Sequence, residues 1–166
     1  MPLQYGTSTS LACTSFNSLA SINTTATAAA STAAATTSTT ANVTDIMVRV
    51  KIVCPTFTPT SSTGIEIYAY GSEDGTNYPG AGATNEVLTG ADAAVTLSTN
   101  SNNLRFLGFL SCHTTGATMT SQPMSLVAAF GIIPRKWAIV IRNALPATNS
   151  LAASGHSVNY TEIFYN

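Results

Sequence analysis

From Asp45 onward, apolar and polar side chains alternate along the chain with a period of two. In Asp45–Cys54 one set of alternate positions holds Ile46, Val48, Val50 and Ile52. Successive side chains of a β-strand point to opposite faces of the sheet, so this pattern predicts a strand with one buried face. Gly64–Gly71 alternates in the same way and predicts a second strand.

Five further apolar stretches, separated by Gly, Pro, Asn and Thr, also predict short strands. They are Ala93–Ser98, Asn103–Cys112, Pro123–Phe130, Trp137–Asn143 and Ser157–Tyr165. No stretch of about 12 residues combines helical periodicity with capping residues. We therefore predict an all-β fold, an antiparallel β-sandwich that is jelly-roll-like, with a mixed α/β fold as the weaker alternative.

The first 44 residues contain no charged side chain, and Asn23–Thr44 is a low-complexity tract of Ala, Thr and Ser. Alanine favours helix, but the interleaved threonines oppose it. We expect extended chain or strand here; a flexible linker and an arm that orders only on assembly are the alternatives. The chain then divides into an uncharged N-terminal arm or set of edge strands, residues 1–44, and a β-sandwich domain, residues 45–166.

Charge is scarce throughout, with six basic and seven acidic side chains among 166 residues and a net charge of −1. A surface of hydroxyls, amides and methyl groups can be buried against a partner without stranding ions, so we expect much of it to be an interface. Six scattered basic residues do not form the cluster that nucleic acid binding requires. The longest apolar run, Leu126–Ile133, is too short to span a bilayer, and the N-terminus does not resemble a secretory signal. We expect synthesis in a cytoplasm, with no nucleic acid and no membrane as partner.

The stretch around Asp74-Gly75 is the most turn-like part of the chain. Asp-Gly between two β-rich runs is a strong turn signal, because glycine adopts positive φ and aspartate bonds its own backbone. The following residues, Thr76–Tyr78, are positioned to begin a return strand. A calcium loop and a glycosidase carboxylate pair are the alternatives, but calcium loops space their acids at alternate positions and Glu73 and Asp74 are adjacent.

Three cysteines and two histidines are the other candidates for chemistry. Cys13, Cys54 and Cys112 are far apart in sequence and form no CxxC pair, so we expect reduced and mostly buried thiols. Cys112 and His113 are adjacent, and on a strand they would point to opposite faces. We predict no catalytic residue, no metal site and no cofactor.

The densest basic patch is Arg135-Lys136, which precedes the single tryptophan, Trp137. We expect Trp137 to begin a core strand, with Arg135 and Lys136 at the strand end, where they can dock on an acidic partner. Tyr68, Tyr70 and Tyr78 are candidates for an aromatic platform that contacts sugar or a neighbouring subunit; cross-strand packing is the alternative.

The stretch IEIYAYGSEDGTNY, residues 65–78, resembles the strand–turn–strand motif S-x-D-G-x-x-W/Y of galactose-binding-like, discoidin-type β-sandwiches. Tyr78 stands at the aromatic position of the motif, and the chain lacks the pair of bridging cysteines usual in that family. In that family the sugar contacts lie in loops at one end of the sandwich. The resemblance makes Glu73, Asp74, Asn77 and Tyr78 candidates for a loop that faces a partner or a glycan.

A broader resemblance covers residues 5–165. An uncharged start, which begins YGTS at Tyr5 and ends SLA at Ala20, is followed by the segments DIMVRVKI, YAYGSEDGTNY, NLRFLGFLSC, SQPMSLVAAFGIIPRKWAIVIRN and LAASGHSVNYTEIFY. This layout looks like that of small structural proteins of tailed bacteriophages. The most specific part is PRKWAIVIRN followed by LAASG and a tyrosine.

This resemblance implies a non-enzymatic virion structural protein, on the capsid surface and assembled in the host cytoplasm. We expect a capsid cement or decoration protein that docks on the major capsid protein, or on another virion protein, and associates with itself, as a trimer or similar ring. Its candidate subunit-interface residues are Tyr5, Phe16, Arg135 and Lys136. The alternative is a tail-associated adaptor or a host-glycan-binding β-sandwich module.

Overall fold

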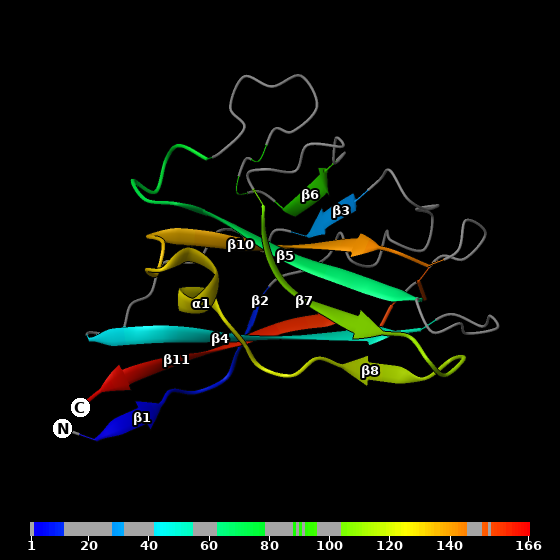
Figure 1. The fold of residues 1–166 in the computed structure, drawn as a ribbon, viewed down its shortest axis with the longest axis horizontal. Helices are drawn as coiled ribbons and strands as arrows, with labels where there is room; N and C mark the ends of the chain where they lie inside the picture. The colour runs from blue at the N-terminus through cyan, green and yellow to red at the C-terminus, as the bar shows by residue number, and fades with distance from the viewer. Residues whose placement is uncertain are drawn as a thin grey trace.

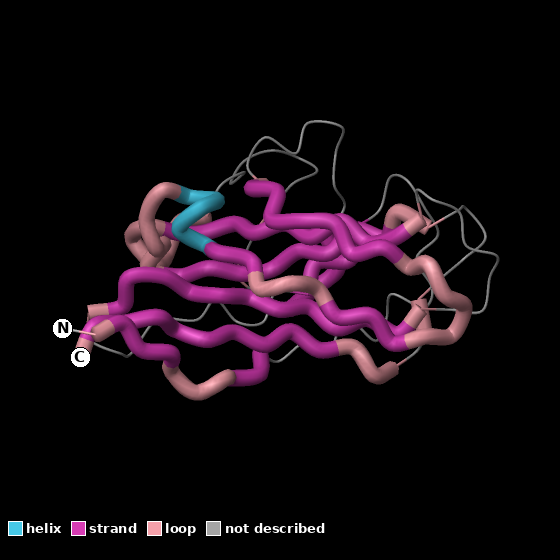
Figure 2. Tube along the Cα trace, turned by 60° about the horizontal axis from the view of Figure 1, so that its bottom comes forward, coloured by secondary structure: helices cyan, strands magenta, loops and turns pink. Residues whose placement is uncertain are grey.

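The computed structural model describes residues 2–11, 28–31, 42–54, 63–78, 88, 90, 92–95, 104–145, 151–152 and 154–166. These residues form two antiparallel β-sheets that lie face to face (Figures 1 and 2). The chain is therefore an all-β sandwich, as the alternating pattern predicts. The chain crosses repeatedly from one sheet to the other.

The first sheet contains β1 (Leu3–Tyr5), β2 (Thr9–Leu11), β4 (Val43–Val53), β8 (Thr118–Thr120), β9 (Met124–Ser125) and β11 (Ser157–Tyr165). Strands β4 and β11 pair at its centre; β1 and β2 pair with β11, and β8 and β9 pair with β4. Leu3 is aligned with Tyr165, so the two ends of the chain lie side by side (Figure 1).

The second sheet contains β3 (Ala28–Ser31), β5 (Gly64–Ser72), β6 (Asp92–Val95), β7 (Arg105–Ser111) and β10 (Lys136–Asn143). Its strand order is β6-β3-β10-β5-β7. Strand β3 therefore lies inside the sheet, between β6 and β10. Strand β7 lies at one edge, and connections to the other sheet follow β4, β7 and β10.

The main core fills the space between the two sheets. Strand β4 contributes the four alternate residues that the sequence pattern predicts to be buried, and each of them is fully buried. Strand β5 contributes Ile65, Ile67 and Ala69, and β10 contributes Trp137, Ile139 and Ile141. Removal of this apolar surface from water is the main force that holds the sheets together.

A second, smaller cluster covers the outer face of the second sheet. Ala138 and Val140 of β10 pack there with Tyr70, Leu88 and Leu104. Alternate residues of β10 thus pack on opposite faces of the sheet, and both faces are buried along most of the strand. This second layer explains why β10 is a nearly continuous apolar run.

The stretch Pro123–Phe130 corrects a sequence prediction, because it is not one strand. Only β9 is extended, and Leu126–Phe130 forms the short helix α1. Ser125 caps the helix by accepting a hydrogen bond from the Ala128 amide, and Gly131, with φ of 82°, ends it. Serine at the N-cap and glycine after the last turn are the usual signals of helix ends.

The described parts of residues 1–44 are hydrogen-bonded into both sheets. Strands β1 and β2 extend the first sheet, and β3 lies inside the second. Most of the Asn23–Thr44 tract lies outside the described residues. Among the described residues, no helix is long and apolar enough to cross a membrane.

Candidate functional site

The loop that follows β5 is built around the Asp74 carboxylate. It accepts hydrogen bonds from the backbone amides of Thr76 and Asn77, both at 2.8 Å, and from the Ser72 hydroxyl at 2.9 Å. Gly75 has φ of 78°, the conformation that glycine adopts without strain. The predicted turn at Asp74-Gly75 is confirmed. The predicted return strand is wrong, because Thr76–Tyr78 is not extended in a sheet and β5 pairs with β7 and β10 instead.

These contacts also fix the charge of the loop. Hydrogen bonds from the Asn77 and Thr76 amides, in that order, hold the pKa of the Asp74 carboxyl well below its ordinary value. Asp74, Glu73 and Asn77 are all exposed. The loop therefore presents a fixed negative charge to solvent down to acidic pH.

Arg135 and Lys136 lie against this loop. A Cβ atom placed on Gly75 would be 3.4 Å from Cδ of Arg135 and 3.6 Å from Cε of Lys136. The pairing of β5 with β10 causes this approach, because it aligns Lys136 with Ser72. We call Glu73, Asp74, Asn77, Arg135 and Lys136 the corner site; it unites an acidic loop and a basic strand end that are about sixty residues apart in sequence.

Tyr78, the fourth residue of the predicted loop, has a different environment. Its ring packs edge-on against Tyr70 with centroids 5.6 Å apart, and it lies directly over Gly90. The Gly90 amide donates a hydrogen bond to the Tyr70 hydroxyl at 3.0 Å. Burial, assisted by the nearby charge of Asp74, raises the pKa of Tyr78. This packing favours a structural role for Tyr78 over that of a free sugar platform.

Tyr5 is the most exposed large apolar side chain of the described residues, with 73% of its surface accessible. It lies on the edge strand β1 beside Leu3, which is 52% exposed. Tyr5 also borders a shallow hollow of about 380 Å³ lined by Arg49, Asn159 and Thr161 among others. Tyr5 is therefore available to a partner, whereas Phe16 lies outside the described residues.

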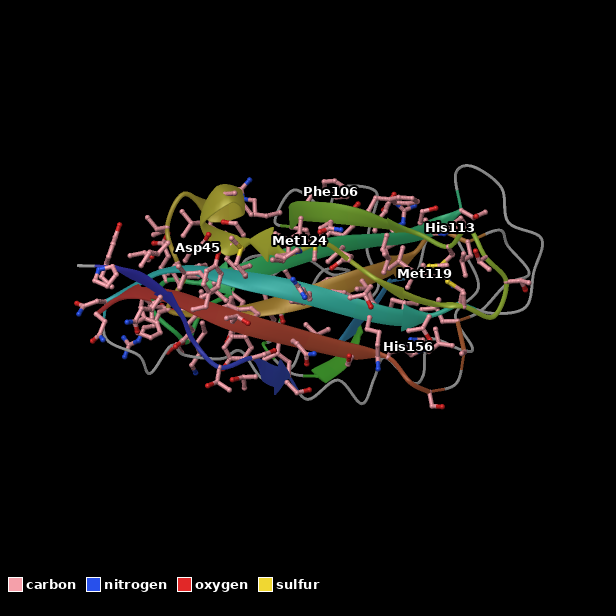
Figure 3. The ribbon with its side chains drawn as sticks, turned by 90° about the horizontal axis from the view of Figure 1, so that it is seen from below. Asp45, Phe106, His113, Met119, Met124 and His156 are labelled. Atoms are coloured by element: carbon pink, nitrogen blue, oxygen red, sulfur yellow. The ribbon has the colours of Figure 1, made fainter. Side chains whose placement is uncertain are left out.

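The sequence did not indicate an aromatic patch on the outer face of the second sheet. Phe106 and Phe109 of β7 are 57% and 46% exposed, and Phe106 packs edge-on against Tyr68 at 5.5 Å. Figure 3 shows Phe106 on the outside of the sandwich. We call Tyr68, Phe106 and Phe109 the aromatic patch; of the predicted platform, only Tyr68 belongs to it, because Tyr70 is fully buried.

A polar group borders this patch. Glu66 Oε2 accepts hydrogen bonds from the Tyr68 hydroxyl at 2.8 Å and from Nη1 of Arg142 at 2.9 Å. Burial and the Glu66 carboxylate raise the pKa of Tyr68. Glu66 is aligned with Phe109 on one neighbouring strand and with Arg142 on the other, and this register brings the polar group beside the aromatic patch. Strand register cannot be predicted from the sequence alone.

The histidines occupy different environments at the same end of the molecule, away from Asp45 (Figure 3). Cys112 is fully buried and His113 is exposed, but both lie after the end of β7 and not on a strand, so the predicted arrangement on opposite strand faces does not apply. His156 is buried and bonded to backbone atoms. Within the described ranges, no three His, Cys, Asp or Glu side chains are grouped closely enough to hold a metal ion.

Comparison with protein-family models, with curated proteins and with solved structures gave no match. The function is therefore inferred from the surface chemistry of the chain itself.

Proposed function

We propose that this chain is a non-enzymatic structural protein of a tailed-bacteriophage virion, and that it acts as a capsid cement or decoration protein. One observation carries the proposal: a chain with very few charges exposes large apolar side chains on its edge strands, Tyr5 on β1 and Phe106 on β7. Edge strands present unpaired backbone groups, so soluble proteins usually protect them with charge. Uncovered apolar edges favour a partner that covers them.

The mechanism we propose is burial of apolar surface against the major capsid protein and against further copies of this chain. Each Å² of apolar area removed from water contributes roughly 25 cal/mol. A modest contact per copy becomes large when it is repeated by symmetry over a shell. The corner site, with side chains of both charge signs, sets the orientation of docking more than its strength.

The proposed location is the capsid surface, after synthesis in the host cytoplasm. A cryo-EM map of the particle that carries this chain tests it directly. Density at symmetry-related positions on the shell supports the cement role. Density confined to the tail or its vertex supports the adaptor alternative instead.

Binding of purified variants to the particle tests whether the β1 surface contacts the capsid. Tyr5→Ser, which removes the most exposed apolar ring, is expected to weaken binding at least tenfold, since a buried aromatic anchor contributes about 2 kcal/mol. His113→Ser, at an exposed loop position away from β1, is the control and leaves binding unchanged. Equal binding by Tyr5→Ser and the unsubstituted chain argues against the β1 surface.

A host-glycan-binding module is the second candidate, and the aromatic patch favours it. Exposed rings beside a carboxylate and a guanidinium offer stacking surface and hydrogen bonds to a sugar. A glycan array with the unsubstituted chain and with Phe106→Ala distinguishes the candidates. Binding that is lost in Phe106→Ala supports the glycan function, and an array without signal excludes the glycans it displays.

A further inference from the structure

Two cysteines that are far apart in sequence meet at one end of the sandwich. Cys54 directly follows β4 in the first sheet, and Cys112 directly follows β7 in the second. Their side chains lie close enough for each thiol to affect the pKa of the other. Both belong to the main core, with 2% and 0% of their surface exposed, respectively.

Backbone hydrogen bonds hold each cysteine in place. The Cys54 amide donates to the Ala117 carbonyl at 2.9 Å, and the Cys112 amide donates to the Thr63 carbonyl at 3.0 Å. The Thr63 hydroxyl donates to the Cys112 carbonyl at 3.1 Å. Thr63 lies just before β5, in the connection that follows Cys54. Ala117 lies just before β8, in the connection that follows Cys112. The backbone of each cysteine is therefore hydrogen-bonded to the connection that follows the other cysteine. The two thiols are thus kept together by the fold.

We propose that Cys54 and Cys112 form a cross-linking site, which closes into an intramolecular disulfide between the two sheets when the protein meets a small disulfide oxidant such as oxidised glutathione. One thiolate attacks the glutathione disulfide, which gives a mixed disulfide and releases one glutathione. The second thiolate then displaces the other glutathione. Two protein thiols become one disulfide, and one oxidised glutathione becomes two reduced molecules.

The environment of the two thiols makes this reaction slow. Burial raises the pKa of both thiols, so little thiolate is present in the closed fold. Attack therefore requires local opening of this end of the sandwich. The thiols stay reduced in a cytoplasm and oxidise outside it. This inference stands on the cysteine pair alone and does not depend on the virion proposal.

The cross-link would tie together residues 54–112, which include β5, β6 and β7. Closing a loop of this length removes much of the chain entropy of the unfolded state. For a chain of this size we expect the midpoint of thermal unfolding to rise by about 10 °C, and to fall back after reduction with dithiothreitol.

The test uses the full chain, reduced and then incubated with oxidised glutathione at mild warmth. Free thiols are alkylated under denaturing conditions and the protein is digested with trypsin. Cleavage at Arg49, Lys51, Arg105 and Arg135 places the three cysteines in separate peptides, 1–49, 52–105 and 106–135. A linked pair of peptides 52–105 and 106–135, with Cys13 alkylated, supports the proposal.

Matched variants show which cysteines are responsible for the rise in the unfolding midpoint. Cys13→Ser keeps the linked pair and the rise in the unfolding midpoint. Cys54→Ala and Cys112→Ala, which leave the core apolar, show no rise. The proposal is overturned if Cys54 and Cys112 both remain alkylatable after oxidation, or if either pairs with Cys13 or with another molecule. The peptide measurement on the unsubstituted chain decides this even where an alanine variant fails to fold.

Discussion

At the scale of single residues, His156 has the most constrained chemistry. Its Nδ1 accepts a hydrogen bond from the Val53 amide at 3.2 Å, and its Nε2–H donates to the Ala152 carbonyl at 2.7 Å. This pattern requires a neutral ring with its proton on Nε2. Burial, together with the charge of Lys51, lowers the pKa of His156, although the bond to Ala152 acts in the opposite direction.

Stability should therefore fall in mild acid. A depressed pKa in the fold means that the contribution of neutral His156 is full above pH of about 6.5 and is lost as the pH falls through the folded-state pKa. Urea unfolding at pH 7.5 and pH 5.0 measures this. His156→Gln should cost about 1–2 kcal/mol at pH 7.5 and show a smaller difference between the two pH values. The exposed His113 serves as control, and a pH dependence that His156→Gln leaves unchanged contradicts the assignment.

Asp74 supports a second prediction at this scale. Because its pKa is depressed, its hydrogen bonds to the Thr76 and Asn77 amides should persist as the pH falls through about 4, where an ordinary aspartate titrates. The NMR shifts of these two amides should stay constant from pH 5 to pH 3.

The matched variants are Asp74→Ala and Glu73→Ala, adjacent exposed acids of which only Asp74 is seen to bind the loop backbone. Asp74→Ala should speed hydrogen exchange at Thr76 and Asn77 at least tenfold, and Glu73→Ala should leave it unchanged. Equal exchange rates in both variants would show that other contacts hold the loop.

At the scale of elements, α1 shows where the sequence prediction failed. Its apolar run looks the same whether it forms a strand or a short helix. The side-chain caps decide: Ser125 accepts from the Ala128 amide, and Asp45 of β4 accepts from the Val127 amide and the Ser125 hydroxyl. Ser125 and Gly131 are visible in the sequence, but the contribution of Asp45 depends on a strand 80 residues away.

Removal of these caps should destabilise the fold measurably. Asp45→Ala deletes a partly buried acceptor of three hydrogen bonds and should cost about 2 kcal/mol, whereas Ser125→Ala should cost about 1 kcal/mol. Because the two side chains bond each other, the double variant should cost less than the sum of the single ones. Chemical denaturation of all four proteins measures the coupling, and strict additivity would contradict a shared cap.

The long strands were predictable because each carries its own alternation of apolar and polar residues. Strand β8 was not, since Thr118–Thr120 has no pattern of its own and gains its hydrogen bonds from β4. The same contrast between local and distant signals explains why the turn of the corner site was predicted and the rest of the site was not. Asp74-Gly75 is a local signal, but the approach of Arg135 depends on the pairing of β5 with β10.

At the scale of the whole molecule, the composition shows that charge is scarce. It does not show that strands from the N-terminal residues pair within both sheets. An uncharged Ala/Thr/Ser tract is compatible with an arm that leaves the domain intact when removed. In the structure, β3 pairs with β10 on one side and with β6 on the other. Its removal would separate β6 from the sheet and leave a hydrogen-bonding edge of β10 unpaired.

Two truncations should therefore behave differently. Removal of residues 1–7 deletes β1 at the edge of the first sheet, and should leave a chain that unfolds cooperatively but loses the apolar surface of Leu3 and Tyr5. Removal of residues 1–41 also deletes β3, and should abolish cooperative unfolding or solubility, since the exposed β10 edge is open to aggregation. Thermal unfolding monitored by circular dichroism, with particle binding of the shorter truncation, tests both. A chain that starts at Asn42 and unfolds cooperatively would show that β3 is dispensable and that the N-terminal residues act as an arm.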